Sequence, residues 1–189
     1  INASSINTLT GSAAELNTAY SSSGISGLGN ETITLTDTSI AISVLSTLDT
    51  YTSGDIYASS INTLTGSAAD LNTAYSSSEF QITGLGSEAV ILTDTSLAVS
   101  VLNTLDNYTS GYAAIDASSI NTLTGSAADL NTAYSSSGIS GLGNVALTLT
   151  DTSLAVSVLN ALDDNTSGDI NASSINTLTG SAADLNTAY

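Results

Sequence analysis

The segment from residue 32 to residue 48 changes from an alternating to a helical pattern of hydrophobic positions. Four positions spaced i, i+2, i+5 and i+7 fall on one side, with threonines between them: Ile33, Leu35, Thr38 and Ile40. This spacing predicts a short strand followed by a corner. A helical stripe follows, formed by Ile40, Val44, Leu45 and Leu48. We expect Asp37 or Ser39 to cap this helix and the TSG sequence after it to end it.

A second pattern occupies residues 1–20. Apolar residues in strand-like positions come first, namely Ile1, Ala3, Ile6 and Leu9. A helix is then predicted by a capping box, in which a serine is followed three residues later by an acid. The boxes are Ser12 with Glu15, Ser67 with Asp70, Ser126 with Asp129, and Ser181 with Asp184. On the first helix, Ala13, Leu16 and Tyr20 share the buried face.

These two patterns are repeating modules, A and B, in the order A, B, A, B, A, B, A. The A modules start 55, 59 and 55 residues apart. The longer middle spacing reflects insertions in EFQITGLG (79–86) and GYAAID (111–116), which we expect to be connections. The A modules are residues 1–23, 56–81, 115–137 and 170–189, and the B modules are residues 24–55, 82–114 and 138–169.

Near-identical copies favour a stack of units over a compact domain, because a stack reuses one set of core residues. We therefore predict an α/β repeat fold: a right-handed solenoid of alternating strand–helix modules with a stacked parallel β-sheet, in one array over residues 1–189. The modules average about 28 residues, and the LxLxxTxL segment of module B resembles the strand of leucine-rich repeats. Thr or Ile stands where those repeats have Asn at the corner, so the resemblance implies the architecture and no binding function.

The composition excludes most catalytic chemistry. Lys, Arg, His, Cys, Met, Trp and Pro are absent, so the chain has no thiolate, Schiff-base amine or ordinary base for a hydroxyl nucleophile. We expect no enzyme and no catalytic or cofactor-binding residues. The net charge of −17 repels nucleic acid and anionic lipid. A hydrophobic share of 41% with a mean hydropathy of +0.25 is too apolar for a disordered acidic tail, yet no apolar run is long enough for a membrane span.

Several acids are candidates for capping or for calcium. Asp37, Asp94 and Asp151 precede predicted helices and are expected to cap them. Calcium is the one cation that we consider, and the densest group of acids is Asp163, Asp164 and Asp169. Further acids stand in the final turns of the predicted B helices, where they could form turns or hold calcium: Asp49, Asp106 and Asp163.

Other recurring residues suggest surface roles or packing. Thr32, Thr34, Thr36 and Thr38 form an outward row like those of some ice-binding solenoids, although later copies carry Ala89, Ile91 and Ala146. Glycan attachment is conceivable at five N-x-S/T sequons: Asn2, Asn30, Asn107, Asn165 and Asn171. The GLG sequences at 27–29, 84–86 and 141–143 predict turns. Packing of the A helices, with stacking between rungs, is expected of Tyr20, Tyr75, Tyr134 and Tyr189.

The phrases NTLTGSAADLNTAY and GLGNETITL resemble the giant tandem-repeat cell-surface proteins of marine cyanobacteria. The resemblance implies a very large secreted or cell-surface protein of which this chain is an excerpt, with a structural role as a fibre, stalk or coat. The absence of trypsin-type cleavage sites suits an extracellular place. Expected partners are neighbouring repeats, further copies of the chain, surface glycans or cations. The alternative is an adhesin or a calcium- or ice-binding array.

Overall fold

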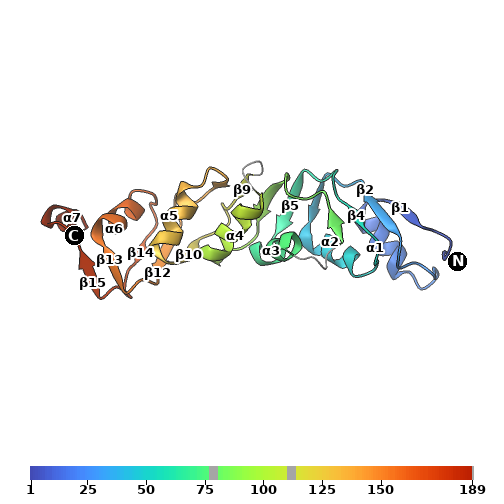
Figure 1. The fold of residues 1–189 in the computed structure, drawn as a ribbon, viewed down its shortest axis with the longest axis horizontal. Helices are drawn as coiled ribbons and strands as arrows, with labels where there is room; N and C mark the ends of the chain where they lie inside the picture. Colours follow the sequence, from blue (N-terminus) through green and yellow to red (C-terminus); the bar gives the residue numbers. More distant parts are fainter. Residues whose placement is uncertain (77–80, 110–113, 189) are drawn as a thin grey trace.

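Short strands and short helices alternate along the protein. A computed structural model describes residues 1–76, 81–109 and 114–188, in which there are seven helices and fifteen strands. The described chain is elongated, with its two termini at opposite ends (Figure 1). The helices are α1 (Ala13–Ser21), α2 (Ile42–Asp49), α3 (Ala68–Ser76), α4 (Val99–Thr109), α5 (Ala127–Ser135), α6 (Val156–Asp163) and α7 (Ala182–Ala188).

The strands are two to four residues long and pair in parallel. Those in A modules are β1 (Thr8–Gly11), β4 (Ile56–Tyr57), β5 (Thr63–Gly66), β9 (Ile115–Asp116), β10 (Thr122–Gly125), β14 (Ile170–Asn171) and β15 (Thr177–Thr179). Those in B modules are β2 (Thr32–Leu35), β3 (Ser39–Ala41), β6 (Ile82–Thr83), β7 (Ala89–Leu92), β8 (Ser96–Ala98), β11 (Ile139–Ser140), β12 (Ala146–Leu149) and β13 (Ser153–Ala155). The prediction of an α/β fold with parallel strands is thus confirmed, but every module after the first carries two or three short strands rather than one.

In the described residues the strands form four parallel sheets. They do not form one continuous sheet, because the register of pairing shifts from strand to strand. Leu9 pairs with Ile33, which pairs in turn with Ile56. The repeat counterpart of Leu9 is Leu64, eight residues beyond Ile56. The pairing in each sheet therefore shifts toward the start of the module at each successive strand, and the sheet ends where no further strand residue is available to pair. The sheets are β1-β2-β4-β6, β11-β9-β7-β5-β3, β14-β12-β10-β8 and β13-β15.

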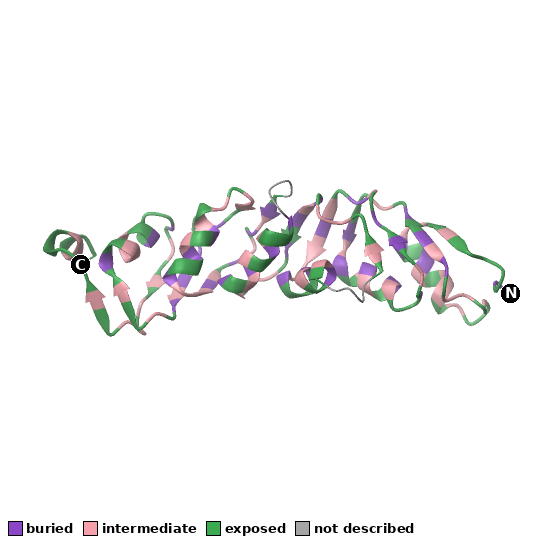
Figure 2. Ribbon diagram, in the orientation of Figure 1, coloured by how far each residue is buried: buried purple, intermediate pink, exposed green. Residues whose placement is uncertain are grey.

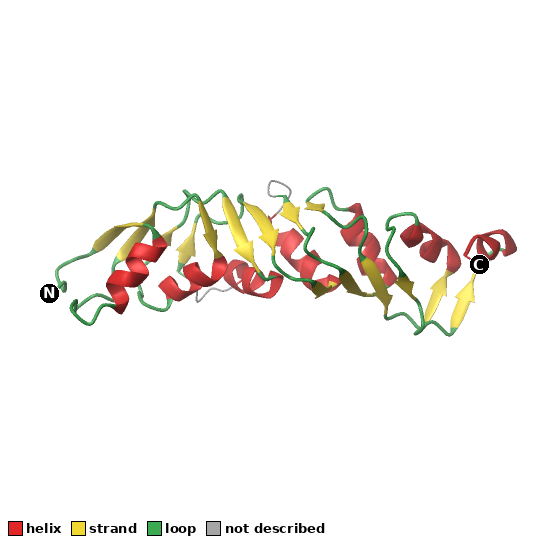
Figure 3. Cartoon of the chain, turned by 180° about the vertical axis from the view of Figure 1, so that it is seen from behind, coloured by secondary structure: helices red, strands yellow, loops and turns green. Residues whose placement is uncertain are grey.

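The slip matches the course of the helices. Figure 3 shows the helices below the strands near the N-terminus and above them near the C-terminus, so the two layers wind around each other along the length of the molecule. A fresh ladder begins at each B module with the strand before its helix: β3, β8 and β13.

The core is a continuous row of aliphatic side chains between the strands and the helices. Figure 2 colours the buried residues of the ribbon purple. In the B helix the buried face is Ile42, Leu45 and Leu48. Two members of the predicted stripe differ: Ile40 lies on β3, and Val44 is only half-buried. The difference arises because β3 keeps the chain extended up to Ala41, so that the helix begins later than the periodicity suggested.

One glycine in each A module after the first allows the B helix of the preceding module to approach closely. A Cβ on Gly125 would lie 2.3 Å from Cγ1 of Val99, the first residue of α4. A Cβ on Gly66 would lie 2.4 Å from Cγ2 of Ile42. Only a residue without a side chain fits at this position, because non-bonded carbon atoms pack at about 3.5–4.0 Å.

Candidate functional site

Three predicted capping acids cap helices of neighbouring modules rather than their own. Oδ2 of Asp37 accepts a hydrogen bond from the N–H of Ala13, at the start of α1, over 2.8 Å. The helix that follows Asp37 begins at Ile42, and its N-cap residue, Ala41, provides no side-chain hydrogen bond. The extended residues of β3 separate the carboxylate from that helix, so the sequence prediction was wrong about the partner. The other two bonds join Asp94 to Ala68 over 2.8 Å and Asp151 to Ala127 over 2.7 Å.

The first capping box of the A helices is confirmed in full, and the other three show its serine half. Oγ of Ser12 accepts from the N–H of Glu15, and Oε2 of Glu15 accepts from the N–H of Ser12. The hydroxyl of Ser12 also donates to Oε2 of Glu15, and this bond, followed by the one from the Ser12 N–H, holds the pKa of Glu15 below its ordinary value. The hydroxyls of Ser67, Ser126 and Ser181 accept in the same way, each at 3.1 Å, from Asp70, Asp129 and Asp184. Each of the first three A helices thus receives its own serine cap and a carboxylate from the next module.

Two acids in the last turn of the B helices reach the end of the next A module, just before the following B module begins. Oδ1 of Asp49 accepts from the N–H of Gln81 at 3.2 Å, and Oδ2 of Asp106 accepts from the hydroxyl of Ser136 at 2.8 Å. Burial raises the pKa of Asp49 above its ordinary value, against the opposing effect of the Gln81 bond. These carboxylates therefore hold connections in place despite facing the unfavourable end of the helix dipole.

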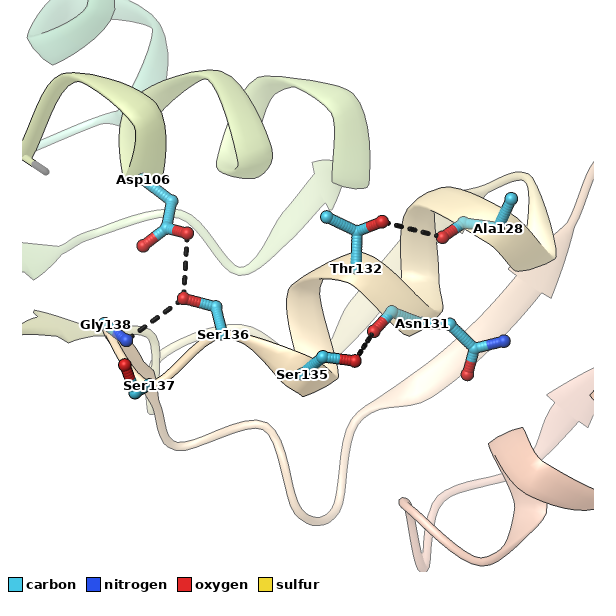
Figure 4. Close-up of a pocket in the computed structure, with 8 residues that line it drawn as sticks. All are labelled: Asp106, Ala128, Asn131, Thr132, Ser135, Ser136, Ser137 and Gly138. Carbon is cyan, nitrogen blue, oxygen red and sulfur yellow. Dashed lines mark hydrogen bonds between the residues drawn. The ribbon is translucent and has the colours of Figure 1, made fainter. Parts of the chain in front are cut away.

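A cleft of about 630 Å³ lies beside Asp106 (Figure 4). Its lining is polar and small, and comes from the end of α4, from α5 and from the residues after α5: Asp106, Ala128, Asn131, Thr132, Ser135, Ser136, Ser137 and Gly138. Its hydroxyls are engaged locally, since Thr132 donates to the carbonyl of Ala128 and Ser136 donates to Asp106. The cleft carries one carboxylate and no second titratable group.

The acids considered as candidates for calcium do not come together. Asp163, Asp164 and Asp169 form no group that could hold a metal ion, and neither does any other set of three carboxylates in the part of the chain that the structure describes. Asp163 instead borders a cavity of about 310 Å³ with Leu159 and Ile170, near the C-terminal end.

The threonine row is interrupted across the rungs. Thr10 pairs with Thr34, but the next residue in that row is Tyr57. In the neighbouring sheet, Thr65 is followed by Ile91 and Asp116. The flat threonine array that ice binding requires is therefore absent from these two sheets.

The remaining sequence candidates fall in expected places. The GLG turns begin with glycines of positive φ, near 86–90°, at Gly27, Gly84 and Gly141. All five sequon asparagines are exposed. Of the two insertions, residues 79–80 and 111–113 lie outside the described residues.

Two buried glutamates were not singled out by the sequence. Glu31 and Glu88 are 0% and 1% exposed, although the chain has no Lys, Arg or His side chain to pair with them. Oε2 of Glu31 accepts from the hydroxyl of Tyr20 at 2.7 Å and from the N–H of Gly29 at 2.8 Å. Burial acts to raise the pKa of Glu31, but the hydrogen bonds outweigh it and hold the pKa below its ordinary value. Burial, followed by the bond to Glu31, raises the pKa of Tyr20.

Each of these glutamates sits beside a stacked pair of tyrosines. The rings of Tyr20 and Tyr51 are 5.7 Å apart at 4°, and those of Tyr75 and Tyr108 are 6.1 Å apart at 20°. The predicted stacking thus occurs between an A tyrosine and the following B tyrosine, not among the A tyrosines. Tyr189 lies outside the described residues. A signal was present in the sequence, since both Glu and the B tyrosine are replaced together in the third B module, by Val145 and Asn165.

Comparison of the chain with protein-family models, with curated proteins and with solved structures finds no match. Among the described residues, no helix has the length and apolar character needed to cross a bilayer.

Proposed function

We propose that this chain is a structural repeat segment of a giant secreted or cell-surface protein that forms an elongated fibre, stalk or coat. Its modules would stack as a right-handed solenoid, with neighbouring repeats of the same protein as the main partners. The proposal rests chiefly on one observation: each of the three A–B junctions carries the same hydrogen bond from the A-helix N-terminus to a B-module carboxylate.

The reverse junctions, from B to the following A, also repeat one contact. The hydroxyls of Ser60, Ser119 and Ser174 donate to the carbonyls of Leu35, Leu92 and Leu149, over 2.8, 2.8 and 2.6 Å. A unit with matched contacts on both sides can be added without limit, and its stability accumulates through identical interfaces.

The burial of equivalent leucines also depends on whether a module has neighbours on both sides. Leu64 and Leu123, which have neighbours on both sides, are fully buried, whereas Leu9 in the first module and Leu178 in the last are only half-buried. The hand of the solenoid is inferred from the parallel strand–helix–strand connections, which are right-handed in about 98% of cases.

The alternative functions have weaker support. The interrupted threonine row disfavours an ice-binding array, and the scattered acids disfavour a calcium array. If a calcium array were the function, a chelator would lower the thermal midpoint of the purified chain. On our proposal the chelator leaves the midpoint unchanged.

Small-angle scattering tests the stacking. Arrays extended by one and by two further A–B pairs should lengthen by about 11 Å for each pair, because a pair adds slightly more than two rungs at about 4.8 Å each. The matched control adds a pair with the same composition in scrambled order, which should add no regular secondary structure by circular dichroism. A maximum dimension that stays constant would contradict the stacking.

Immunogold labelling tests the location and the fibre. Antibodies against the repeated NTLTGSAADLNTAY sequence should label the outside of intact source cells, on extended material. Labelling only after permeabilisation would refute the surface location.

A further inference from the structure

The two stacked tyrosine pairs join adjacent modules. Tyr20 lies at the end of α1, and Tyr51 follows the end of α2 in the next module. Their near-parallel rings at 5.7 Å have the spacing of offset stacking. Tyr51 is 37% exposed, so a solvent-borne oxidant can reach it. Tyr75 and Tyr108 repeat the arrangement, and Tyr108 has the same exposure.

The inner tyrosine of each pair donates its hydroxyl proton to a buried carboxylate. Tyr20 donates to Glu31, and Tyr75 donates to Glu88 in the same way. Oε1 of Glu31 is buried and has no hydrogen-bond partner among the described residues. The carboxylate therefore has unused capacity to accept a proton from the phenol.

The third A–B junction keeps the inner tyrosine, Tyr134, but lacks the other two members of the unit. Val145 stands in place of the glutamate and Asn165 in place of the outer tyrosine. The hydroxyl of Tyr134 donates instead to the carbonyl of Leu142 at 3.2 Å. The chain therefore contains its own comparison between junctions with and without the tyrosine–glutamate unit.

Tyrosine is the one residue type through which this chain could be cross-linked by mild oxidation. Cys, Met, Trp and His are absent, and Lys is absent too, so that neither disulfides nor lysine-derived cross-links can form. We propose that the pairs Tyr20–Tyr51 and Tyr75–Tyr108 are sites of oxidative tyrosine coupling, which joins neighbouring modules covalently. The oxidant would be hydrogen peroxide acting through a haem peroxidase or an equivalent one-electron oxidant.

The reaction balances as a two-electron oxidation. Each phenol loses one electron and its hydroxyl proton and becomes a phenoxyl radical. The two radicals join through a carbon–carbon bond between ring positions next to the hydroxyls, and the hydrogens on those carbons move to the oxygens. The product has lost two hydrogen atoms, and peroxide takes up the two electrons and two protons to give two waters.

Glu31 and Glu88 act as positioning groups that receive the phenol proton as the electron leaves. A base within hydrogen-bond distance accelerates proton removal by about 10²–10⁴. Only the biological purpose of the coupling rests on the proposed structural role, because a cross-link at the junctions would hold a fibre together under tension. The coupling chemistry can succeed or fail independently of where the protein is found.

The test uses the whole chain treated with hydrogen peroxide and a haem peroxidase. The product is denatured, digested with a protease that cleaves after acidic residues, and analysed by mass spectrometry. We expect two intrachain linked peptides, each two hydrogen atoms lighter than its parts, which join Tyr20 to Tyr51 and Tyr75 to Tyr108. Tyr134 should remain unlinked. Linkage that falls equally on the exposed Tyr57 and on Tyr134, or no linkage of the two pairs, would overturn the proposal.

Two variants at the first junction sharpen the test, with the second junction of the same molecule as reference. Tyr51→Asn copies the residue of the third junction and should abolish the first linkage while the second is retained. Glu31→Gln keeps the side-chain shape but removes the proton acceptor, and should slow the first linkage at least about tenfold relative to the second.

The thermal midpoint of each variant shows whether the fold is intact. If Glu31→Gln leaves the ratio of the two linkages unchanged in a folded chain, the proton-accepting role of the glutamate is refuted. Glu31→Val, which copies the third junction, provides a second variant of the same test if Glu31→Gln fails to fold.

Discussion

Replacing Gly125 by alanine tests whether consecutive modules are in contact as closely as the structure indicates. The added Cβ would lie 2.3 Å from Cγ1 of Val99, well inside the usual carbon–carbon separation of about 3.5–4.0 Å. Val99 is itself fully buried at the start of α4, so it has no free space to move into. Overpacking of this kind typically costs about 1–3 kcal/mol.

The first A module provides the matched control. Gly11 occupies the same position in the TLTG sequence, but a Cβ there would meet nothing closer than Oε2 of Glu15, at 3.6 Å. In Gly11→Ala the reduced freedom of the unfolded chain should dominate and stabilise the protein by about 0.4–1 kcal/mol. The same substitution in the same sequence is therefore expected to have opposite signs at the two sites.

Urea unfolding followed by circular dichroism measures both variants. For a chain of this size, each kcal/mol also corresponds to about 2–4 °C in thermal midpoint. A double variant, Gly125→Ala with Val99→Ala, should recover part of the loss, with a coupling energy of about 0.5–3 kcal/mol. Equal effects of Gly11→Ala and Gly125→Ala, or the absence of coupling, would refute the close approach between modules.

Three further predictions follow from the charges and hydrogen bonds. Asp94→Ala should lower the free energy of unfolding by about 0.5–2 kcal/mol and speed hydrogen exchange of the Ala68 amide, whereas Asp55→Ala at an exposed site should do neither. The pKa of Tyr20 is raised in the folded state, so its stabilising contribution is complete below the ordinary phenol pKa of about 10 and is lost as the pH rises above that value. When the pH is raised into this range, the thermal midpoint of Tyr20→Phe should therefore fall less than that of the unsubstituted chain. Since 17 acids face no cation, the thermal midpoint should rise with sodium chloride concentration, and an unchanged midpoint between low and high salt would contradict this.

The burial of Glu31 and Glu88 could not be predicted from the sequence. Charged residues are usually exposed, and nothing near Glu31 in the sequence offers it a cation. Its burial becomes acceptable only because the backbone of the GLG turn and the hydroxyl of Tyr20, 11 residues away, donate to it. The paired replacement by Val145 and Asn165 was the one visible sign that these positions act together.

Interactions between residues close together in the chain could be predicted from the sequence alone. The capping boxes span three residues, and the alternating and helical patterns span one element each, so the Ser12 cap, the A helix and the strand at 32–35 could be read directly. The order of the modules and the expectation of parallel strands came from repetition, which is also a property of the sequence.

The tertiary structure decided which residues meet across the rungs. Asp37 bonds to Ala13, 24 residues earlier, and Leu9 stacks in line with Ile56 rather than with Leu64. The reason is physical: the chain needs about 24 residues to cross both layers and return, whereas the modules are longer than that on average. The extra residues in each module shift the pairing register at every rung. No local pattern in the sequence indicates how many residues the chain needs to cross both layers and return.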